Sequence, residues 1–325
     1  MTTKDDVLKY LREQQGDWIS GETLSNRMGI SRSAVWKQIS RLRQEGYVIQ
    51  STPNKGYVLS EIPEMLLPAE IGEGLDTSVF GKQGIVYEGE MDSTNRKARD
   101  LAVKGAPEGT LVVAEKQTGG RGRRGRYWFS PRKAGIYASL ILRPKLPPNE
   151  APKITLLTGV TVAEAFMALT PLKPAIKWPN DILVNGRKIC GILTESSMEM
   201  DAIHHVVVGV GINVNTRKFP DELKEIGTSV YLETGRTFDR VALLKEFLRR
   251  FEEHYRNFLS SGFGSVEKRW RELAVVLGKE VTVRMIDATC RGRAVELDRD
   301  GALIIQEKNG ERRKIYSGDI QIHGK

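Results

Sequence analysis

The first 62 residues carry a pattern of apolar positions that predicts three helices followed by a hairpin. Apolar side chains recur at helical spacing within residues 4–14 and again within residues 31–46. Between these segments we expect a helix with Ser20 as its N-cap and Gly29 at its end. Two short apolar runs then flank a Pro-Asn-Lys-Gly turn, as in a β-hairpin. Residues 1–62 are therefore predicted to form a winged helix-turn-helix domain.

The next part of the chain, residues 63–274, begins in a linker with two prolines and mixes strand and helix patterns, which predicts an α/β domain. Apolar runs typical of strands occur at 110–117, 135–143, 175–197 and 204–214. Helical patterns occur at 92–105, 152–169, 239–260 and 264–274. Short alternating strands follow at 279–286, 289–297, 301–308 and 312–318. These predict a small C-terminal β-barrel over residues 275–325.

Composition excludes some classes of protein. No apolar run reaches the roughly 18 residues that a membrane-spanning helix needs, so no membrane association is expected. The two cysteines, Cys190 and Cys290, form no C-x-x-C pair, so neither a disulfide framework nor a zinc site is predicted. A cytoplasmic protein fits this cysteine usage. The net charge of +9 is compatible with a nucleic acid or an anionic small molecule as ligand.

The most unusual segment is "QTGGRGRRGRYWFSPRK", residues 117–133, which we call the arginine loop. It contains a G-x-G-x-x-G pattern, but no helical pattern follows it, as a dinucleotide-binding loop requires. A Walker loop is excluded too, because Arg126 and Tyr127 stand where Lys and Ser or Thr would be. Seven Lys and Arg and no acidic residue lie between Lys116 and Lys133. The loop is therefore strongly cationic without being a known glycine-rich nucleotide loop.

Three interpretations of this loop are possible. It is either a solvated basic segment, or a nucleic-acid site on which Tyr127, Trp128 and Phe129 stack, or a holder of a small ligand that bears phosphate. Loops of this length are commonly functional or disordered. We favour the third interpretation, with a loop that is mobile when empty and folds over its ligand.

The segment "KWPNDILVNGRKICGIL" predicts a hairpin that turns at Asn185-Gly186. In that register Val184 faces Arg187, Leu183 faces Lys188 and Asp181 faces Cys190. Lys188 and Asp181 then share one face as diagonal neighbours. They are either a structural ion pair or a lysine held by a carboxylate and directed at a reacting oxyanion. Lys177 lies just before this hairpin.

Several other residues carry weaker signals. Ser93, Thr94 and Asn95 open a helix, either as caps or as contacts for a polar ligand. Glycines inside a buried strand, Gly209 and Gly211, indicate close approach of a ligand or of another backbone, and Asn213 follows them. Structural roles are predicted for the histidines and for Cys190. His204 and His205 lie on opposite faces of that strand, and His254 and His323 show no metal-binding spacing. Cys190 is expected to be buried and inert. Without a G-x-S-x-G elbow, the chain is predicted to bind and polarise its substrate.

These motifs together resemble the bifunctional biotin–protein ligases that also repress the biotin operon. The resemblance covers essentially the whole chain and depends most on "GRGRRG" and "KWPND". It implies an α/β (α+β) fold with an N-terminal winged helix-turn-helix, a central mixed sheet flanked by helices as in class II aminoacyl-tRNA synthetases, and a small SH3-like C-terminal β-barrel.

The resemblance also implies a two-step reaction. Biotin and MgATP form biotinyl-5′-AMP and pyrophosphate, and a lysine of a carrier domain then accepts the biotinyl group. The implied cofactors are ATP and Mg2+, with no dedicated protein metal site. The implied partners are the biotin carboxyl carrier domain of acetyl-CoA carboxylase, other biotin-dependent carboxylases, and operator DNA with an inverted repeat. Biotinyl-5′-AMP is the implied corepressor and promotes a homodimer.

Site residues follow from the matched motifs. Arg123, Lys188 and Lys177 are the predicted catalytic residues. The predicted biotin contacts are Ser93, Thr94, Asn95, Gln117, Arg121, Gly122, Arg123 and Lys188. The predicted nucleotide contacts are Arg126, Trp128, Asn180, Asp181 and Asn213. In the first domain, the predicted DNA contacts are Arg32, Ser33, Trp36 and Lys37 on the recognition helix and Lys55 on the wing.

Three rival functions remain open: a biotin-sensing repressor without catalysis, a lipoate or octanoate acyltransferase, and RNA binding by the arginine loop. Intact Arg123 and Lys188 argue against the first, and the winged helix together with "GRGRRG" argues against the second. Substitution of Arg123 distinguishes the third, because it would weaken nucleic-acid binding at low salt instead of adenylate retention.

Overall fold

The structure is a computed structural model that describes residues 3–14 and 16–323. The chain divides into two compact units, Met1–Met65 and Leu66–Lys325. Each unit is described by itself. The second unit contains both the central sheet and the C-terminal sheet, so these two parts share one body.

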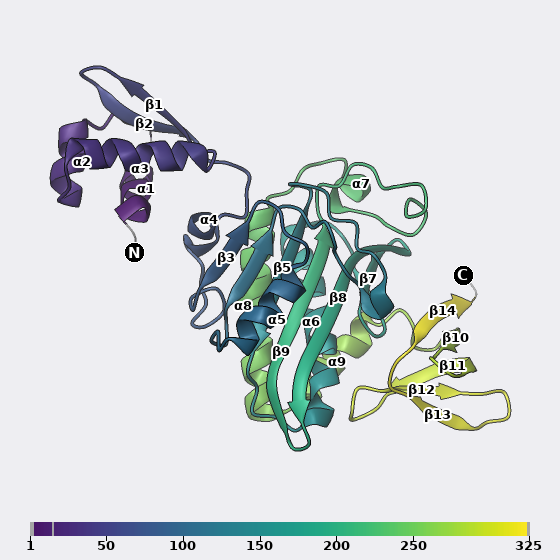
Figure 1. Cartoon of the computed structure of the whole chain (residues 1–325). Coiled ribbons are helices and arrows are strands. Elements are labelled where there is room, and N and C mark those ends of the chain that lie inside the picture. Colours follow the sequence, from purple (N-terminus) through teal and green to yellow (C-terminus); the bar gives the residue numbers. More distant parts are fainter. Residues whose placement is uncertain (1–2, 15, 324–325) are drawn as a thin grey trace. The chain divides into compact units, whose positions relative to one another are not determined.

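The first unit consists of three helices and a two-stranded antiparallel sheet (Figure 1). Its elements are α1 (Thr3–Glu13), α2 (Gly21–Met28), α3 (Arg32–Gln44), β1 (Val48–Thr52) and β2 (Gly56–Glu61). The Ser20 hydroxyl accepts a hydrogen bond from the Thr23 N–H at 2.9 Å, and Gly29 ends α2 in the left-handed conformation. The predicted winged helix-turn-helix pattern is confirmed.

The second unit is built on a mixed seven-stranded sheet of order β3-β4-β5-β9-β8-β7-β6. Only β3 and β4 pair in parallel among these neighbours. The strands are β3 (Ile85–Glu88), β4 (Leu111–Ala114), β5 (Gly135–Leu142), β6 (Ala175–Lys177), β7 (Asp181–Val184), β8 (Arg187–Glu199) and β9 (Ala202–Asn213). The helices are α4 (Pro68–Gly72), α5 (Thr94–Val103), α6 (Ala151–Leu169), α7 (Val230–Thr234), α8 (Arg240–Ser261) and α9 (Gly264–Leu273). The central α/β architecture is as predicted.

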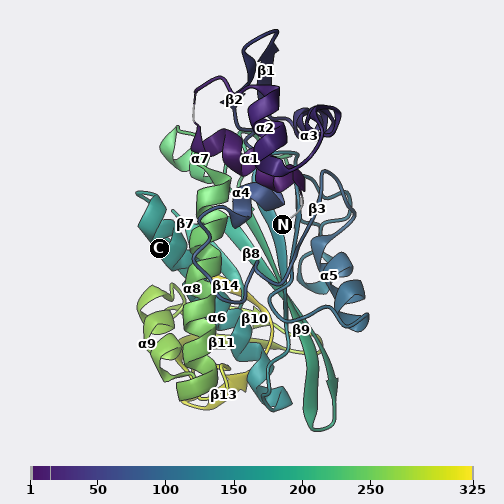
Figure 2. The same cartoon turned by 90° about the vertical axis from the view of Figure 1, so that its left-hand side faces the viewer.

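Helices cover both faces of this sheet. Figure 2 shows α6, α8 and α9 on one face and α5 on the other. The two faces bury separate apolar clusters, one around α6 and α8 and a smaller one around Ala98 and Ala102 of α5. The segment Pro148–Leu169 is apolar and long enough to cross a membrane, but 67% of its most apolar window is buried inside the protein. Its apolar side chains therefore serve the core.

The C-terminal part forms a five-stranded antiparallel sheet of order β13-β12-β11-β10-β14. Its strands are β10 (Glu280–Arg284), β11 (Thr289–Leu297), β12 (Leu303–Gln306), β13 (Arg312–Ile315) and β14 (Asp319–His323). The last of these was not predicted, and neither were β3, α4 and α7, because such short segments carry little periodicity. The buried Trp178 indole donates a hydrogen bond to the Gly301 carbonyl at 3.2 Å, which ties this sheet to the central one.

The register of the β7–β8 hairpin differs from the prediction at one position. Val184 faces Arg187 and Leu183 faces Lys188, as expected. The prediction that Asp181 faces Cys190 is wrong, because Ile182 lies opposite Cys190 and Asp181 lies opposite Gly191. A β-bulge between the pairs Ile182–Cys190 and Leu183–Lys188 shifts the register by one residue on β8. Asp181 and Lys188 still share a face, since the bulge leaves both on the side of Leu183.

Candidate functional site

A cavity of ≈ 660 Å³ opens in the second unit, within the size range of small-molecule sites. Six segments line it: the start of α5, the arginine loop, residues 177–180, the β7–β8 hairpin, the end of β9 and residues 219–227. Part of β14 completes the wall. All fourteen residues that the sequence assigned to a small-molecule site lie along this cavity: Ser93, Thr94, Asn95, Gln117, Arg121, Gly122, Arg123, Arg126, Trp128, Lys177, Asn180, Asp181, Lys188 and Asn213.

One end of the cavity is a network of neutral hydrogen-bonding groups. Ser93 caps α5, and Thr94 donates from its N–H and its hydroxyl to the Gln117 side-chain oxygen at 2.9 and 3.1 Å. The Gln117 amide in turn donates to the Ser130 hydroxyl at 3.0 Å. The buried Ser139 hydroxyl lies 2.8 Å from that of Thr94. Sequence reasoning missed Ser139, although a lone serine within an apolar strand was the available signal.

At this end of the cavity, Asn95 forms hydrogen bonds mainly with other residues of the protein. Its amide donates to the Leu193 carbonyl at 3.1 Å and to the Glu195 carboxylate at 2.8 Å, and its oxygen accepts from Ser139 at 2.6 Å. A Cβ atom at Gly209 would lie only 1.9 Å from that oxygen. Gly209 therefore makes room for a side chain of α5, where the sequence predicted the approach of a ligand or another backbone. A ligand contact by Asn95 stays a prediction.

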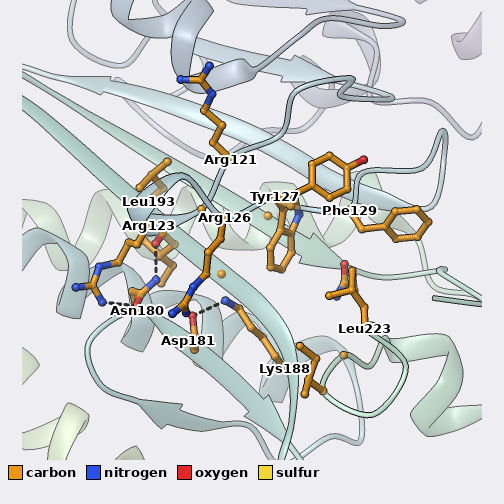
Figure 3. Close-up of a pocket in the computed structure, with 18 of the residues that line it drawn as sticks. Arg121, Arg123, Arg126, Tyr127, Phe129, Asn180, Asp181, Lys188, Leu193 and Leu223 are labelled. Atoms are coloured by element: carbon orange, nitrogen blue, oxygen red, sulfur yellow. Dashed lines mark hydrogen bonds and ion pairs between the residues drawn. The ribbon is translucent and has the colours of Figure 1, made fainter. Parts of the chain in front are cut away.

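The other end of the cavity is charged. The Lys188 ammonium lies 2.6 Å from the Asp181 carboxylate (Figure 3). It also lies 5.2 Å from the centroid of the Trp128 ring. Two strand glycines create the space for this group: a Cβ at Gly211 would lie 2.4 Å from the Trp128 indole nitrogen, and one at Gly191 would lie 3.2 Å from the Lys188 ammonium. The indole nitrogen is buried and has no hydrogen-bond partner among the described residues.

Arg123 joins this charged end from the arginine loop. Its guanidinium donates to the Asn180 side-chain oxygen at 3.1 Å and to the Gly318 carbonyl at 3.3 Å. Burial lowers the pKa of Arg123 from its usual value, and the nearby Asp319 carboxylate opposes that shift. Arginine remains charged even so. The charged end thus holds two cations from different segments, Arg123 and Lys188.

Two further loop arginines contact the C-terminal sheet. Arg124 and Arg126 both pair with Asp319 of β14, Arg124 at 3.2 Å. Figure 3 shows Arg121 extending away from Lys188 and Asp181. Sequence reasoning missed Asp319, because its partners are almost 200 positions away in the chain.

Two further predicted residues, Asn213 and Lys177, also line the cavity. The Asn213 amide donates to the Thr228 carbonyl at 3.1 Å, and its side-chain oxygen is buried with no hydrogen-bond partner among the described residues. Lys177 is half-buried at the cavity wall. Unsatisfied buried polar atoms are uncommon in proteins, so the Asn213 side-chain oxygen and the Trp128 indole nitrogen are groups with which a bound ligand could pair.

Histidine and cysteine lie outside this chemistry. His204 is exposed and His205 is buried, on opposite faces of β9 as predicted. Both cysteines are buried and free, and burial raises the pKa of Cys190 above its usual range. Within the described part of the chain, no group of three or more His, Cys, Asp or Glu side chains is placed to hold a metal.

The first unit exposes the residues predicted to contact DNA. Arg32, Ser33, Trp36 and Lys37 are exposed on α3, while Val35, Ile39 and Leu42 on its other face are fully buried. Trp36 is 60% exposed, which is unusual for so large an apolar ring. Lys55 is exposed on the hairpin turn, and its ammonium lies 5.9 Å from the centroid of the Trp18 ring.

Comparison with known proteins identifies three family matches. Residues 89–213 match the biotin/lipoate A/B protein ligase family, residues 3–58 match an HTH domain, and residues 276–322 match the biotin protein ligase C-terminal domain.

Full-length relatives cover nearly all of the chain. It is 42% identical over 323 residues to the bifunctional ligase/repressor BirA of Bacillus spizizenii, covering 99% of both chains. It is 31% identical to the protein of the same name from Escherichia coli, covering 94% of both. A solved biotin protein ligase from Aquifex aeolicus, in complex with biotin and ATP, superimposes with a TM-score of 0.64 at 32% identity, covering 74% of this chain and 98% of that one. The chain therefore belongs to the biotin protein ligase family, among its bifunctional ligase/repressor members.

Proposed function

We propose that this protein is an ATP-dependent biotin–protein ligase and a transcriptional repressor of biotin synthesis genes. The observation that carries the ligase proposal is the polarity of one cavity. One end presents neutral hydrogen-bonding groups, and the other presents Arg123 and Lys188. A neutral cyclic urea joined by an apolar chain to a carboxylate that becomes a phosphate anhydride has the same polarity.

In the proposed complex, Ser93, Thr94 and Gln117 bind the ureido ring of biotin. Thr94 and Gln117 are already fixed by hydrogen bonds to each other and to neighbours, so they bind with little further loss of conformational freedom. Arg121, Gly122 and Asn95 are proposed to complete the biotin contacts. Arg126, Trp128, Asn180, Asp181 and Asn213 are proposed to surround the nucleotide.

The proposed reaction needs no protein nucleophile. In the first step a biotin carboxylate oxygen bonds to the α-phosphorus of ATP, and the bond from that phosphorus to pyrophosphate breaks. In the second step a carrier lysine amine bonds to the carboxyl carbon, AMP leaves, and the amine loses a proton. Arg123 and Lys188 stabilise the negative charge that develops near the phosphate, and Lys177 adds charge at the wall. Asp181 keeps the Lys188 ammonium in place.

Mg2+ is proposed to accompany ATP. Magnesium is usually bound by one or two carboxylates together with substrate phosphates, and Asp181 is the carboxylate beside Lys188, so the residues fit this mode. When bound, the ion supplies neutralisation of phosphate charge.

The repressor role is proposed for the first unit. Arg32, Ser33, Trp36 and Lys37 would enter a major groove, and Lys55 would contact the adjacent backbone. One such domain reads a short half-site, so we propose that a homodimer promoted by biotinyl-5′-AMP binds an operator with an inverted repeat. The proposed protein substrates are the carrier domain of acetyl-CoA carboxylase and those of other biotin-dependent carboxylases, in the cytoplasm.

The ligase proposal is tested by mixing the protein with biotin, MgATP and a biotin-free carrier domain and weighing the carrier by mass spectrometry. We expect the carrier to gain one biotinyl group, and we expect no gain with Arg123→Gly. Arg132→Gln is the matched control, because it removes an exposed cation from the same loop. A protein that binds biotin without transferring it is a sensor only, and one that binds no biotin supports the acyltransferase alternative.

The repressor proposal is tested by measuring monomer–dimer distributions and operator affinity with and without biotin plus ATP. We expect the fraction of dimer and the operator affinity to increase when biotin and ATP are added. Lys37→Ala should weaken DNA binding and leave carrier biotinylation unchanged. If both quantities are indifferent to biotin plus ATP, the proposed corepressor mechanism is wrong.

A further inference from the structure

The segment between β9 and α7 covers part of the cavity and ends beside Lys188. We call residues 217–228 the cover segment. Its residues Phe219, Leu223 and Ile226 line the cavity. Its end pairs with the backbone of Lys188: the Lys188 N–H donates to the Ile226 carbonyl at 2.7 Å, and the Thr228 N–H donates to the Lys188 carbonyl at 2.9 Å. The position of the cover segment and the position of Lys188 are therefore linked.

Thr228 is the point where this linkage is fixed. It is fully buried, and its carbonyl accepts from the Asn213 amide at 3.1 Å. Its hydroxyl donates to the Glu233 carboxylate at 2.5 Å. Thr228 thus contacts Lys188, Asn213 and Glu233 through three different groups, and only the last of these contacts uses its side chain.

Glu233, on α7, binds the hairpin from the other side. Its carboxylate accepts from the Arg187 guanidinium at 2.8 Å and from the Asn185 amide at 2.7 Å, and its side chain is only 4% exposed. Burial raises the pKa of Glu233, but the hydrogen bonds from Thr228, Asn185 and Arg187 outweigh it and keep the value below its usual range. The residue stays ionised and is not among the residues that line the cavity. One buried carboxylate therefore joins the turn that precedes Lys188 to the segment that follows Asn213.

We propose that Glu233 is a positioning residue for the adenylate. By holding Asn185, Arg187 and Thr228 together it fixes the cover segment against Lys188, so that the nucleotide half of the ligand stays enclosed. This inference rests on the proposed function for its ligand. It assigns no contact with biotin to Glu233, because the biotin end is built from α5, β5 and the arginine loop.

The test compares Glu233→Gln and Thr228→Val with Glu253→Gln as the matched control. Glu253 is exposed on α8 and is not among the residues that line the cavity. Thr228→Val removes the hydroxyl and keeps both backbone bonds, and Thr228→Ser should restore the contact. Because each loses a hydrogen bond to a charged group, Glu233→Gln and Thr228→Val should release biotinyl-5′-AMP about tenfold faster than the unmodified protein. Biotin affinity measured without ATP should stay near that of the unmodified protein, and the thermal unfolding temperature should fall by only a few degrees, because one buried hydrogen bond is lost.

Limited trypsin digestion provides a readout that does not depend on catalysis. Lys218 and Lys224 are exposed on the cover segment, so its release should speed cleavage at these two positions in Glu233→Gln and Thr228→Val. Unchanged adenylate release together with unchanged cleavage would overturn the proposal, and so would equal losses of biotin and adenylate affinity. If the unmodified protein formed no adenylate at all, the proposed function would fail, and the cleavage rates alone would decide whether Glu233 fixes the segment.

Discussion

The two ends of the cavity are built differently. At the neutral end, Thr94 and Asn95 at the start of α5 and Gln117 at the start of the arginine loop are held by hydrogen bonds to one another or to Ser139 of β5 and Ser130. At the charged end, Lys188 and Arg123 come from the hairpin and the loop, and the Trp128 indole nitrogen lacks a partner among the described residues. The neutral end is therefore prepared in advance, whereas the charged end carries hydrogen-bonding capacity that a ligand would use.

This difference suggests a division of labour between specificity and chemistry. Polar groups that are held in one geometry by their neighbours bind a matching ligand well. A ligand that cannot pair with them leaves buried groups without a hydrogen bond and therefore binds more weakly. Cations that face a low-dielectric cavity stabilise charge that develops during reaction. Substitutions at the two ends should therefore separate into effects on biotin binding and effects on the adenylate.

The largest effect is expected for Arg123→Gly. Loss of one preorganised cation near a developing charge costs about a hundredfold or more, so adenylate formation should fall and release should speed by that order. Single-turnover kinetics measures the rate of adenylate formation, and a filter-binding assay measures the rate of adenylate release. Arg132→Gln in the same loop should behave like the unmodified protein, and an equal defect in that control would show that loop charge alone matters.

A smaller effect is expected for the ion pair beneath Trp128. Lys188→Gln should speed adenylate release by about tenfold to a hundredfold, because it removes a charge-assisted contact. Asp181→Asn should have less effect when release is measured without magnesium, because Asp181 acts on the ligand through Lys188. Faster adenylate release from Asp181→Asn than from Lys188→Gln, measured without magnesium, would contradict the view that Asp181 acts through Lys188.

Two glycines of β9 allow the ends to be compared on one strand. Gly209→Ala would force Asn95 from its contacts and destabilise the fold by about 1–3 kcal/mol. Gly211→Ala would displace Trp128, which belongs to a loop, so adenylate affinity should fall with a smaller change in stability. Chemical denaturation and calorimetry with an unreactive adenylate analogue give both values. The reverse ranking of stabilities would contradict a rigid neutral end.

The smallest effect on the ligand is expected for the helical layer, whose charges lie away from the cavity. Hydrogen bonding by His254, opposed by burial and aided by Arg269, lowers the pKa of Glu164 to about 2. Its folded pKa is depressed, so its contribution to stability is complete above the unfolded value near 4.5 and is lost as pH falls toward 2. Glu164→Gln should lower the unfolding free energy at pH 7 and should lower it progressively less below pH 4.5. A difference that stays constant with pH would refute this account.

The sequence predicted the residues that line the cavity better than the residues that hold them in place. The motif residues all line the cavity, and the pairs next to the Asn185-Gly186 turn lie where the turn type puts them. The pairing of Asp181 with Cys190 was wrong, because a bulge cannot be read from alternation. Ser139, Glu233 and Asp319 were missed, because their partners are distant in sequence or sit in segments without periodicity. Their roles arise only when the chain has folded.

The most direct test of the central claim compares the affinities of biotin and of an unreactive biotinyl-adenylate analogue by calorimetry. The unmodified protein should bind the analogue far more tightly than biotin, and Lys188→Gln should narrow that gap by weakening the analogue most. A gap that stays the same in Lys188→Gln would show that the charged end does not hold the adenylate.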